Sequence, residues 1–439
     1  MNRIEEYLFK DAELFPDRTA IICSGESVSY SELLARVVRR AEELRQFRNH
    51  VVPFRTSQSI DFLVEYFATH LAGAVAAPLE KDMPSERYEE LSSFLSTRSI
   101  PGSEIADILF TTGTTGKPKG VMISHGAIVA NGENLVESQG FSHNLAFVIC
   151  GPLNHIGSLS KVYPVIMQGA TLCILEGLKD MDAFFRTFEL PYDRFATFLV
   201  PASIRMLLRF CSASLMKIAD KLEFVETGAA PMYQSDMEEL CRILPHTRLY
   251  NTYASTETGI ISTFNYNAGE CIASCLGTRM KNSGFRICDD STISCFGKTM
   301  MSGYFGDDEL SASVMSGNEI HTADLGRCDS RGRLHIIGRK DDLINLGGFK
   351  LSPVEIENAA LSAPGIIDCI CTEVPDVIAG SALKLFVVVE KGFEFSPRKL
   401  AAFLKTRLEP YKVPLKYAQV DKIERTFNGK LNRTFYKEI

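Results

Sequence analysis

Apolar positions follow two alternating spacings along the chain. In segments 31–44 and 60–70 they recur three and four residues apart, the spacing that places side chains on one side of an α-helix. Short apolar runs, typical of buried strands, occur at 106–110, 146–150 and 195–200. This alternation of helical and strand-like segments predicts an α/β fold.

The pattern changes after the segment 338–353 to helix, strand, strand, helix. Ser352 at the N-cap, Pro353 at the first helical position and Glu355 as the closing residue of a capping box predict a helix over 354–361. Strand-like runs 366–374 and 383–390 follow, and Ser396 with Pro397 opens a second helix that ends before Pro410. These elements predict a small α+β domain at 340–439, after a large domain at 1–339.

Composition and charge narrow the class of protein. Of 439 residues, 45% are hydrophobic and 23% are charged, as in ordinary globular proteins. The net charge of −7 argues against a protein that binds nucleic acid by neutralising phosphates. The N-terminus is charged throughout, and the most apolar stretches, 66–79 and 162–175, are shorter than the roughly 20 residues that span a bilayer. We expect no secretory signal and no integral membrane segment.

Cysteines and local charge add two expectations. The twelve cysteines form no C-x-x-C pair, so we expect reduced thiols in a cytoplasmic protein. Residues 398–437 contain 11 basic and 3 acidic residues, an excess of 8 positive charges that could attract an anionic partner.

Residues 106–124 contain the strongest chemical motif. An apolar run enters a loop rich in threonine, glycine and lysine, TTGTTGKPKG (111–120), and a second apolar run leaves it. Glycines allow backbone N–H groups to point inward, while threonines and lysines add hydroxyl donors and positive charge. The loop differs from a Walker A motif because Pro118 follows Lys117, where that motif needs Ser or Thr. The residues predicted to cradle polyphosphate are Thr111, Thr112, Gly113, Thr114, Thr115 and Lys119.

Six motifs resemble, in order, those of the adenylate-forming superfamily, which includes acyl-CoA synthetases, peptide-synthetase adenylation domains and luciferases. They are TTGTTGKPKG (111–120), TGAAP (227–231), YASTET (253–258), HTADLG (321–326), GRKDDLINLGGFKLSPVEIE (338–357) and FNGKLNR (427–433). The resemblance implies a large multi-sheet N-terminal domain and a small, mobile C-terminal domain. It also implies attack of a carboxylate on the α-phosphorus of ATP, which gives an acyl-adenylate and pyrophosphate, followed by capture of the acyl group by a thiol.

The resemblance assigns a metal site and a nucleotide site to the large domain. Glu257, which follows Thr256, is a hard oxygen ligand suited to Mg²⁺ on the ATP phosphates, and both residues are implied to be catalytic. The residues implied to surround adenine are Tyr253, Gly228, Ala229 and Ala230. Asp324 is implied to accept hydrogen bonds from both ribose hydroxyls, and Arg339 to place a charge near ribose or phosphate.

Three features of the C-terminal domain follow from the resemblance. Lys430 comes after an Asn-Gly turn, which projects the next side chain, and is implied to reach the carboxylate and the α-phosphate. Asp341 matches the hinge about which the small domain rotates between half-reactions. Gly347 and Gly348 match the loop that lines the path of the CoA pantetheine arm.

The segment GPLNHIGSLS (151–160) resembles the stretch beside the acyl pocket of acyl- and aryl-CoA ligases. It places His155, an implied catalytic residue, beside the pocket and Gly157 where a side chain would block it. Residues 154–160 contain no aspartate to pair with an α-amino group, so an amino-acid substrate is disfavoured.

The chain also departs from the superfamily. Residues 78–94 lead almost directly into the phosphate loop, and 275–305 is compressed, so part of the large domain is missing. The favoured interpretation is a carboxylic acid–CoA ligase that requires ATP, Mg²⁺, CoA and a fatty or aryl acid. Three alternatives stay open: an enzyme that loads the phosphopantetheine of an acyl carrier protein, a nucleotide- or acyl-binding homologue with weak or no turnover, and an oxygenase of the luciferase type.

Overall fold

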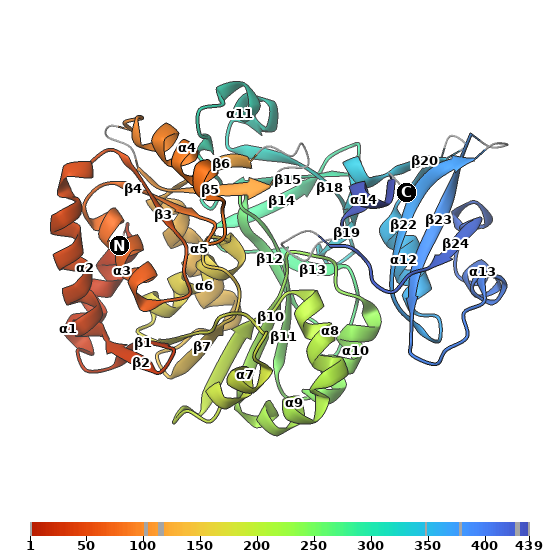
Figure 1. The fold of residues 1–439 in the computed structure, drawn as a ribbon, viewed down its shortest axis with the longest axis horizontal. Coiled ribbons are helices and arrows are strands. Elements are labelled where there is room, and N and C mark those ends of the chain that lie inside the picture. Colours follow the sequence, from red (N-terminus) through yellow and green to blue (C-terminus); the bar gives the residue numbers. More distant parts are fainter. Residues whose placement is uncertain are drawn as a thin grey trace.

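The computed structural model describes residues 2–100, 104–112, 118–346, 349–376, 380–425 and 431–437. The chain forms a large α/β body followed by a small α+β domain at the C-terminal end (Figure 1). This arrangement confirms the predicted fold class.

A long mixed sheet runs through the large body. Within the described residues its strands are ordered β14-β15-β18-β19-β13-β12-β11-β10-β9-β7-β8-β1-β2, and the short β17 pairs with β18. Strands β1, β8, β7, β9, β10 and β11 run parallel to their neighbours in this series. The strands are β1 (Thr19–Cys23), β2 (Glu26–Ser29), β7 (Leu145–Ile149), β8 (Thr171–Ile174), β9 (Arg194–Phe198), β10 (Leu222–Thr227), β11 (Arg248–Ser255), β12 (Gly259–Asn265), β13 (Cys275–Arg279), β14 (Ser283–Ile287), β15 (Thr292–Gly297), β17 (Met315–Ser316), β18 (Glu319–Cys328) and β19 (Leu334–Arg339).

A second sheet lies beside the N-terminal helices and has the order β16-β6-β5-β4-β3. Its strands are β3 (Val51–Arg55), β4 (Val75–Leu79), β5 (Ile105–Thr112), β6 (Pro118–Ser124) and β16 (Gly303–Tyr304). The predicted strand-like runs at 106–110, 146–150 and 195–200 correspond to β5, β7 and β9.

Helices cover both sheets, and α5 contacts both of them. Helix α5 contacts β6 of one sheet and β12 of the other, and α6 packs against α5 and against β7, β8 and β9. The predicted helices 31–44 and 60–70 correspond to α2 and α3. The helices of the large body are α1 (Ile4–Leu14), α2 (Tyr30–Leu44), α3 (Ile60–Leu71), α4 (Ser85–Ser96), α5 (His125–Gln139), α6 (Ile156–Met167), α7 (Met181–Thr187), α8 (Pro201–Phe210), α9 (Ser212–Ile218), α10 (Gln234–Ile243) and α11 (Asp308–Val314), with 3-10 turns η1 (Arg45–Phe47) and η2 (Ala219–Lys221).

The C-terminal domain has its own hydrophobic core, built from residues that follow 340. Its three-stranded sheet has the order β22-β23-β24 and is accompanied by the hairpin β20-β21. Arg205 Nη1 on α8 lies 3.5 Å from Asp368 Oδ1 on β22, which links this domain to the large body. Its elements are η3 (Lys340–Asp342), β20 (Ile344–Leu346), β21 (Phe349–Leu351), α12 (Pro353–Leu361), β22 (Ile366–Asp376), β23 (Gly380–Val389), α13 (Pro397–Lys405), η4 (Pro410–Lys412), β24 (Lys416–Gln419) and α14 (Arg433–Lys437).

The predicted capping box of α12 is wrong, although the helix itself is confirmed. Ser352 occupies the N-cap position but its side chain makes no capping hydrogen bond. Its hydroxyl instead donates to the carbonyl oxygen of Ile337, at 2.8 Å. The carboxylate of Glu355 accepts from Lys412 Nζ at 2.7 Å. Tertiary partners therefore replace the local capping bonds.

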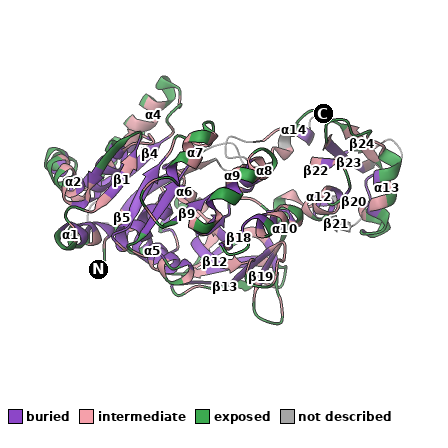
Figure 2. Cartoon of the chain, turned by 90° about the horizontal axis from the view of Figure 1, so that it is seen from below, coloured by how far each residue is buried: buried purple, intermediate pink, exposed green. Residues whose placement is uncertain are grey.

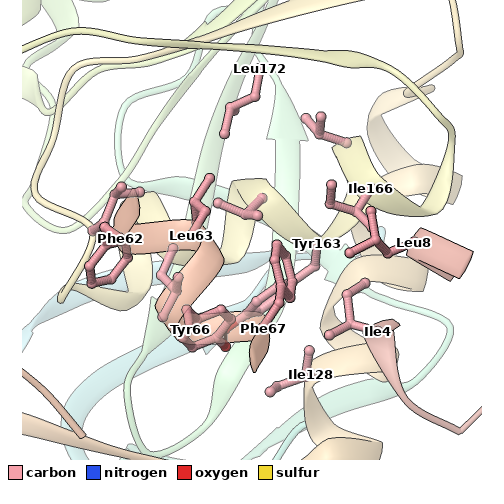
Figure 3. Close-up of a cluster of buried hydrophobic side chains, with 14 of the residues drawn as sticks. Ile4, Leu8, Phe62, Leu63, Tyr66, Phe67, Ile128, Tyr163, Ile166 and Leu172 are labelled. Carbon is pink, nitrogen blue, oxygen red and sulfur yellow. Dashed lines mark hydrogen bonds between the residues drawn. The ribbon is translucent and has the colours of Figure 1, made fainter. Parts of the chain in front are cut away.

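The core beneath the N-terminal helices is densely aromatic and aliphatic. Ile4, Phe67, Tyr163 and their neighbours pack where α1, α3, α5 and α6 meet (Figure 3). Burial is concentrated on the strands of both sheets and on the inward faces of the helices (Figure 2). The described helices are all too short or too polar to cross a bilayer.

A charged network lies inside this core. The His70 ring is fully buried, with Nδ1 2.8 Å from Glu5 Oε1 and Nε2 2.9 Å from Asp107 Oδ1. The Tyr66 hydroxyl donates to Asp107 Oδ2 at 2.9 Å. Burial by itself lowers the pKa of His70, but the two carboxylates outweigh it and raise the pKa to about 10. His70 is therefore a cation shared by two buried anions.

We expect His70→Asn to destabilise the protein by roughly 3–5 kcal/mol, because the substitution leaves two buried carboxylates without a cation. His70 has a pKa of about 10 in the folded chain, above its ordinary 6.5, so its stabilising contribution is full below about pH 6.5 and declines towards pH 10. Thermal unfolding followed by circular dichroism should show that the wild type melts at a higher temperature than the variant. This difference in melting temperature should become smaller between about pH 6.5 and pH 10. The exposed His143→Asn is the control, and a gap independent of pH would contradict a charged His70.

Candidate active site

Several predicted site residues follow the carboxyl ends of parallel strands. His155 comes after β7, Gly228 after β10, and Thr256 after β11. Because these strands are neighbours and run in one direction, the segments that leave them meet at one edge of the sheet. Ligands of open α/β sheets bind at this edge.

The phosphate loop joins two antiparallel strands of the second sheet. Thr111 on β5 is paired with Lys119 on β6, and Thr112 with Pro118. The loop is therefore held at both ends by regular strand pairing. The predicted residues Gly113, Thr114 and Thr115 lie outside the described residues.

Tyr304 brings Glu257 together with the exit strand of the phosphate loop. The hydroxyl of Tyr304 donates to Glu257 Oε1 at 3.2 Å, and Lys119 Nζ lies 5.5 Å from the centroid of the Tyr304 ring. Tyr304 is on β16, where it pairs with Val121 of β6. Burial first and the Glu257 carboxylate second raise the pKa of Tyr304, so its hydroxyl stays a hydrogen-bond donor.

The donor set around Glu257 fits a magnesium ion that is shared with phosphate oxygens. One carboxylate oxygen is oriented by Tyr304, and the side chain is only half-buried, which leaves it accessible to a ligand. Mg²⁺ prefers oxygen ligands and is commonly held by one or two carboxylates together with substrate phosphates. The neighbouring Thr256 is also half-buried.

A second group of residues lies on the ribose side. The Tyr253 hydroxyl donates to Asp324 Oδ2 at 2.7 Å, and Arg339 Nε lies 3.3 Å from Asp324 Oδ1. Asp324 and Arg339 face each other across β18 and β19. Both oxygens of Asp324 thus have protein partners, which the sequence did not reveal. Each oxygen retains a second lone pair that can accept a ribose hydroxyl.

The loop after β10 has the tight geometry expected next to a purine. A Cβ atom at Gly228 would lie 3.0 Å from the carbonyl oxygen of Thr252, so this position has little room for a side chain. Ala229 is exposed and adopts φ +68°, a left-handed conformation that is strained for alanine. Such strain is common where a backbone is shaped for a ligand. Ala230 follows, half-buried.

His155 and Gly157 lie at the start of α6. His155 is at the N-cap and is half-buried. A Cβ atom at Gly157 would lie 3.3 Å from the Phe198 ring at the end of β9. The helix start is therefore adjacent to the carboxyl end of the parallel sheet, as the predicted acyl pocket requires.

The predicted C-terminal residues are mostly outside the described part. Gly347 and Gly348 lie between β20 and β21, whose ends Leu346 and Phe349 pair, and are themselves outside it. Asp341 is exposed within η3. Lys430 also lies outside the described residues.

The chain on either side of the Lys430 segment is firmly anchored. Arg425 and Leu431 form an isolated antiparallel bridge. Arg433 Nη1 donates to Glu357 Oε1 at 2.6 Å, and Arg433 Nε lies 3.6 Å from Asp342 Oδ2. Arg433, three residues after Lys430 in the sequence, is therefore tied to α12 and to η3. Its motif was noted in the sequence, but this role was not.

Comparison with known proteins agrees with this geometry. The profile of the AMP-binding enzymes matches residues 8–93 and 89–305, and the profile of the AMP-binding enzyme C-terminal domain matches residues 355–430. The chain belongs to the AMP-binding enzyme family. The resemblance to the adenylate-forming superfamily is thus confirmed.

The similar proteins span the whole chain. An indoleacetate–CoA ligase from Aromatoleum aromaticum is 25% identical over 99% of this chain and 98% of its own length. A feruloyl-CoA synthase from an Amycolatopsis species is 27% identical over 96% and 95%. The structure of o-succinylbenzoate CoA synthetase from Bacillus subtilis with ATP and magnesium superposes with a TM-score of 0.82, at 23% identity and 98% coverage of both chains. The alignment with the first relative extends over 507 positions, so that relative contains segments that the 439 residues of this chain lack.

Proposed function

We propose that the protein is an ATP-dependent carboxylic acid–CoA ligase. It joins a carboxylate to the AMP portion of ATP with release of pyrophosphate, and then transfers the acyl group to the thiol of CoA with release of AMP. The observation that carries the proposal is the juxtaposition of Glu257, Tyr304 and Lys119 at the base of the phosphate loop. A carboxylate that can hold Mg²⁺, Glu257, and a lysine that can bind phosphate, Lys119, at the same loop suit a magnesium-bound polyphosphate.

Each group has a distinct task in this proposal. Lys119 and the loop hydroxyls bind the phosphates, while Asp324, held by Tyr253 and Arg339, orients the ribose. Glu257, positioned by Tyr304, would hold Mg²⁺, which neutralises charge on the phosphate oxygens. Lys430 supplies positive charge where the carboxylate attacks the α-phosphorus. The small domain, hinged near residue 340, then turns so that the loop at Gly347 and Gly348 meets CoA.

CoA is favoured over a carrier protein as the acyl acceptor. The basic excess at 398–437 was the feature that suggested an acidic protein partner, but much of it is neutralised within the domain. Lys412 pairs with Glu355 and Glu409, Lys416 with Asp376, Lys422 with Glu424, Arg425 with Asp368, and Arg433 with Glu357. The twelve free cysteines suit the reducing cytoplasm, where we propose that the enzyme acts.

The test is pyrophosphate release with ATP, Mg²⁺ and a panel of fatty, aryl and dicarboxylic acids, each with and without CoA. We expect at least one acid to give release that rises when CoA is added, together with formation of its thioester. If an acyl carrier protein accelerates pyrophosphate release and CoA does not, the result would contradict a CoA ligase and favour the enzyme that loads a carrier protein. Absence of release with every acid would contradict ligase activity.

We expect Asp341→Pro to slow thioester formation at least ~10-fold while pyrophosphate release from the first half-reaction changes little. Asp341 is in the first turn of a 3-10 helix, where φ is close to the value that proline fixes. Proline is therefore compatible with this conformation but resists the backbone change that domain rotation requires. Single-turnover assays of the two half-reactions measure the ratio of the rate of thioester formation to the rate of pyrophosphate release. Asp341→Ala is the control, and equal effects of both substitutions would contradict a hinge.

A further inference from the structure

A buried ion pair lies beneath the candidate acyl site. Lys161 Nζ on α6 donates to Glu226 Oε1 on β10 at 2.8 Å. The exposed fractions of the two side chains are 2% and 0%. The two residues are 65 positions apart in the sequence, and none of the motifs that indicated the enzyme family includes them.

The position of the pair follows from its neighbours. Lys161 is four residues after Gly157, so the two share one face of α6. Glu226 is two residues before Gly228, at the end of β10. The Phe198 ring connects the two sides: it lies 3.3 Å from a Cβ at Gly157, 3.8 Å from a Cβ at Gly228, and 5.1 Å from Lys161 Nζ. The pair therefore lies buried between the segment predicted to border the acyl pocket and the loop predicted to contact the nucleotide.

The pair is incompletely satisfied. Glu226 Oε2 is buried and has no hydrogen-bond partner among the residues that the structure describes. An ammonium group offers three N–H donors, of which one goes to Glu226. A buried carboxylate oxygen without a partner is unfavourable, and such a group in a native fold often has a functional explanation.

Charge and hydrogen bonding decide which group completes the site. A hydrocarbon tail would cover Glu226 Oε2 without a donor. A second carboxylate would bring a negative charge next to Glu226, and an ammonium group would bring a positive charge next to Lys161. Because Lys161 and Glu226 together are neutral, either substrate group would leave one buried charge uncompensated. A hydroxyl group is neutral, donates to Glu226 Oε2 and accepts from Lys161.

We propose that Lys161 and Glu226 recognise a hydroxyl group of the acyl substrate, so that the enzyme acts on hydroxylated carboxylic acids, alcoholic or phenolic. The inference rests on the proposed ligase function and names its substrate class. It narrows the fatty and aryl acids of the sequence analysis to those that carry a hydroxyl group away from the carboxylate.

The test compares matched acids in ATP–pyrophosphate exchange with the wild-type protein. The pairs are octanoate and 8-hydroxyoctanoate, phenylacetate and 4-hydroxyphenylacetate, and cinnamate and 4-hydroxycinnamate, with suberate and 8-aminooctanoate as charged analogues. We expect kcat/KM for at least one hydroxylated acid to exceed that of its parent by ~100-fold or more, since a site built for a hydroxyl group rejects the analogue that lacks it.

The double variant Lys161→Met/Glu226→Leu tests whether the ion pair is responsible. It replaces the pair with apolar side chains and leaves no unpaired buried charge, so we expect it to fold. The preference for the hydroxylated acid should disappear or reverse. Should melting curves show that this variant is unfolded, Lys161→Leu/Glu226→Met, which also leaves no unpaired buried charge, makes the same comparison.

Three results would overturn the inference while the ligase function stands. These are equal activity with parent and hydroxylated acids in every pair, highest activity with suberate or 8-aminooctanoate, or a hydroxyl preference that survives in the folded variants. Absence of exchange with every acid would instead remove the proposed function, and this inference with it.

Discussion

The Lys430→Ala variant should form acyl-adenylate ~100- to 1,000-fold more slowly than the wild type, yet transfer the acyl group of a supplied acyl-adenylate to CoA at nearly the wild-type rate. Negative charge concentrates on the phosphate as the carboxylate attacks, and a positioned cation stabilises that charge, so its removal has an effect of this size. The transfer to CoA involves no attack on phosphorus and does not need the lysine. The two half-reactions must therefore separate.

Described contacts flank the segment that contains Lys430. The Arg425–Leu431 bridge and the Arg433–Glu357 ion pair hold both ends of the segment that contains Lys430. Stopped assays of pyrophosphate release and of thioester formation from synthetic acyl-adenylate measure the two rates. Lys422→Ala removes an exposed lysine of the same domain and is the matched control. Equal losses of rate in both half-reactions would contradict a role of Lys430 in adenylate formation alone.

The sequence predicted elements well where local pattern determines them. The apolar run at 106–110 is β5, the predicted helix at 354–361 is α12, and the order helix, strand, strand, helix after the segment 338–353 is confirmed. Family motifs predicted the phosphate loop and the ribose residues because each motif is a short contiguous segment. The boundary at residue 340 and the individual site roles stay predictions.

Contacts between residues that are distant in the sequence could not be predicted from it. Tyr304 orients Glu257 from 47 positions away, and Lys161 reaches Glu226 from 65. No periodicity or motif in the sequence predicts either contact, because each depends on how strands and helices pack. The capping box failed for the same reason: Ser352 has a local pattern, but a carbonyl of β19 competes for its hydroxyl.

The second large effect should come from Glu257→Gln. We expect the substitution to lower kcat/KM for ATP by roughly 100-fold or more and to raise the Mg²⁺ concentration required for half-maximal activity, because a neutral amide binds a hard cation far less well than a carboxylate. Tyr304→Phe removes only the 3.2 Å hydrogen bond that orients this carboxylate, so its effect should be the smaller of the two. Pyrophosphate release titrated with Mg²⁺ at fixed ATP gives both quantities.

The order of these effects separates a metal ligand from a structural acid. If Glu257 only secured Tyr304, Glu257→Gln would cost no more than Tyr304→Phe, because the glutamine amide oxygen can still accept from the Tyr304 hydroxyl, and neither substitution would change the dependence on Mg²⁺. If Glu257 binds the ion, excess Mg²⁺ should partly restore Glu257→Gln but not an inactive Lys430→Ala variant. Identical Mg²⁺ curves for Glu257→Gln and wild type would therefore exclude this carboxylate as the metal ligand.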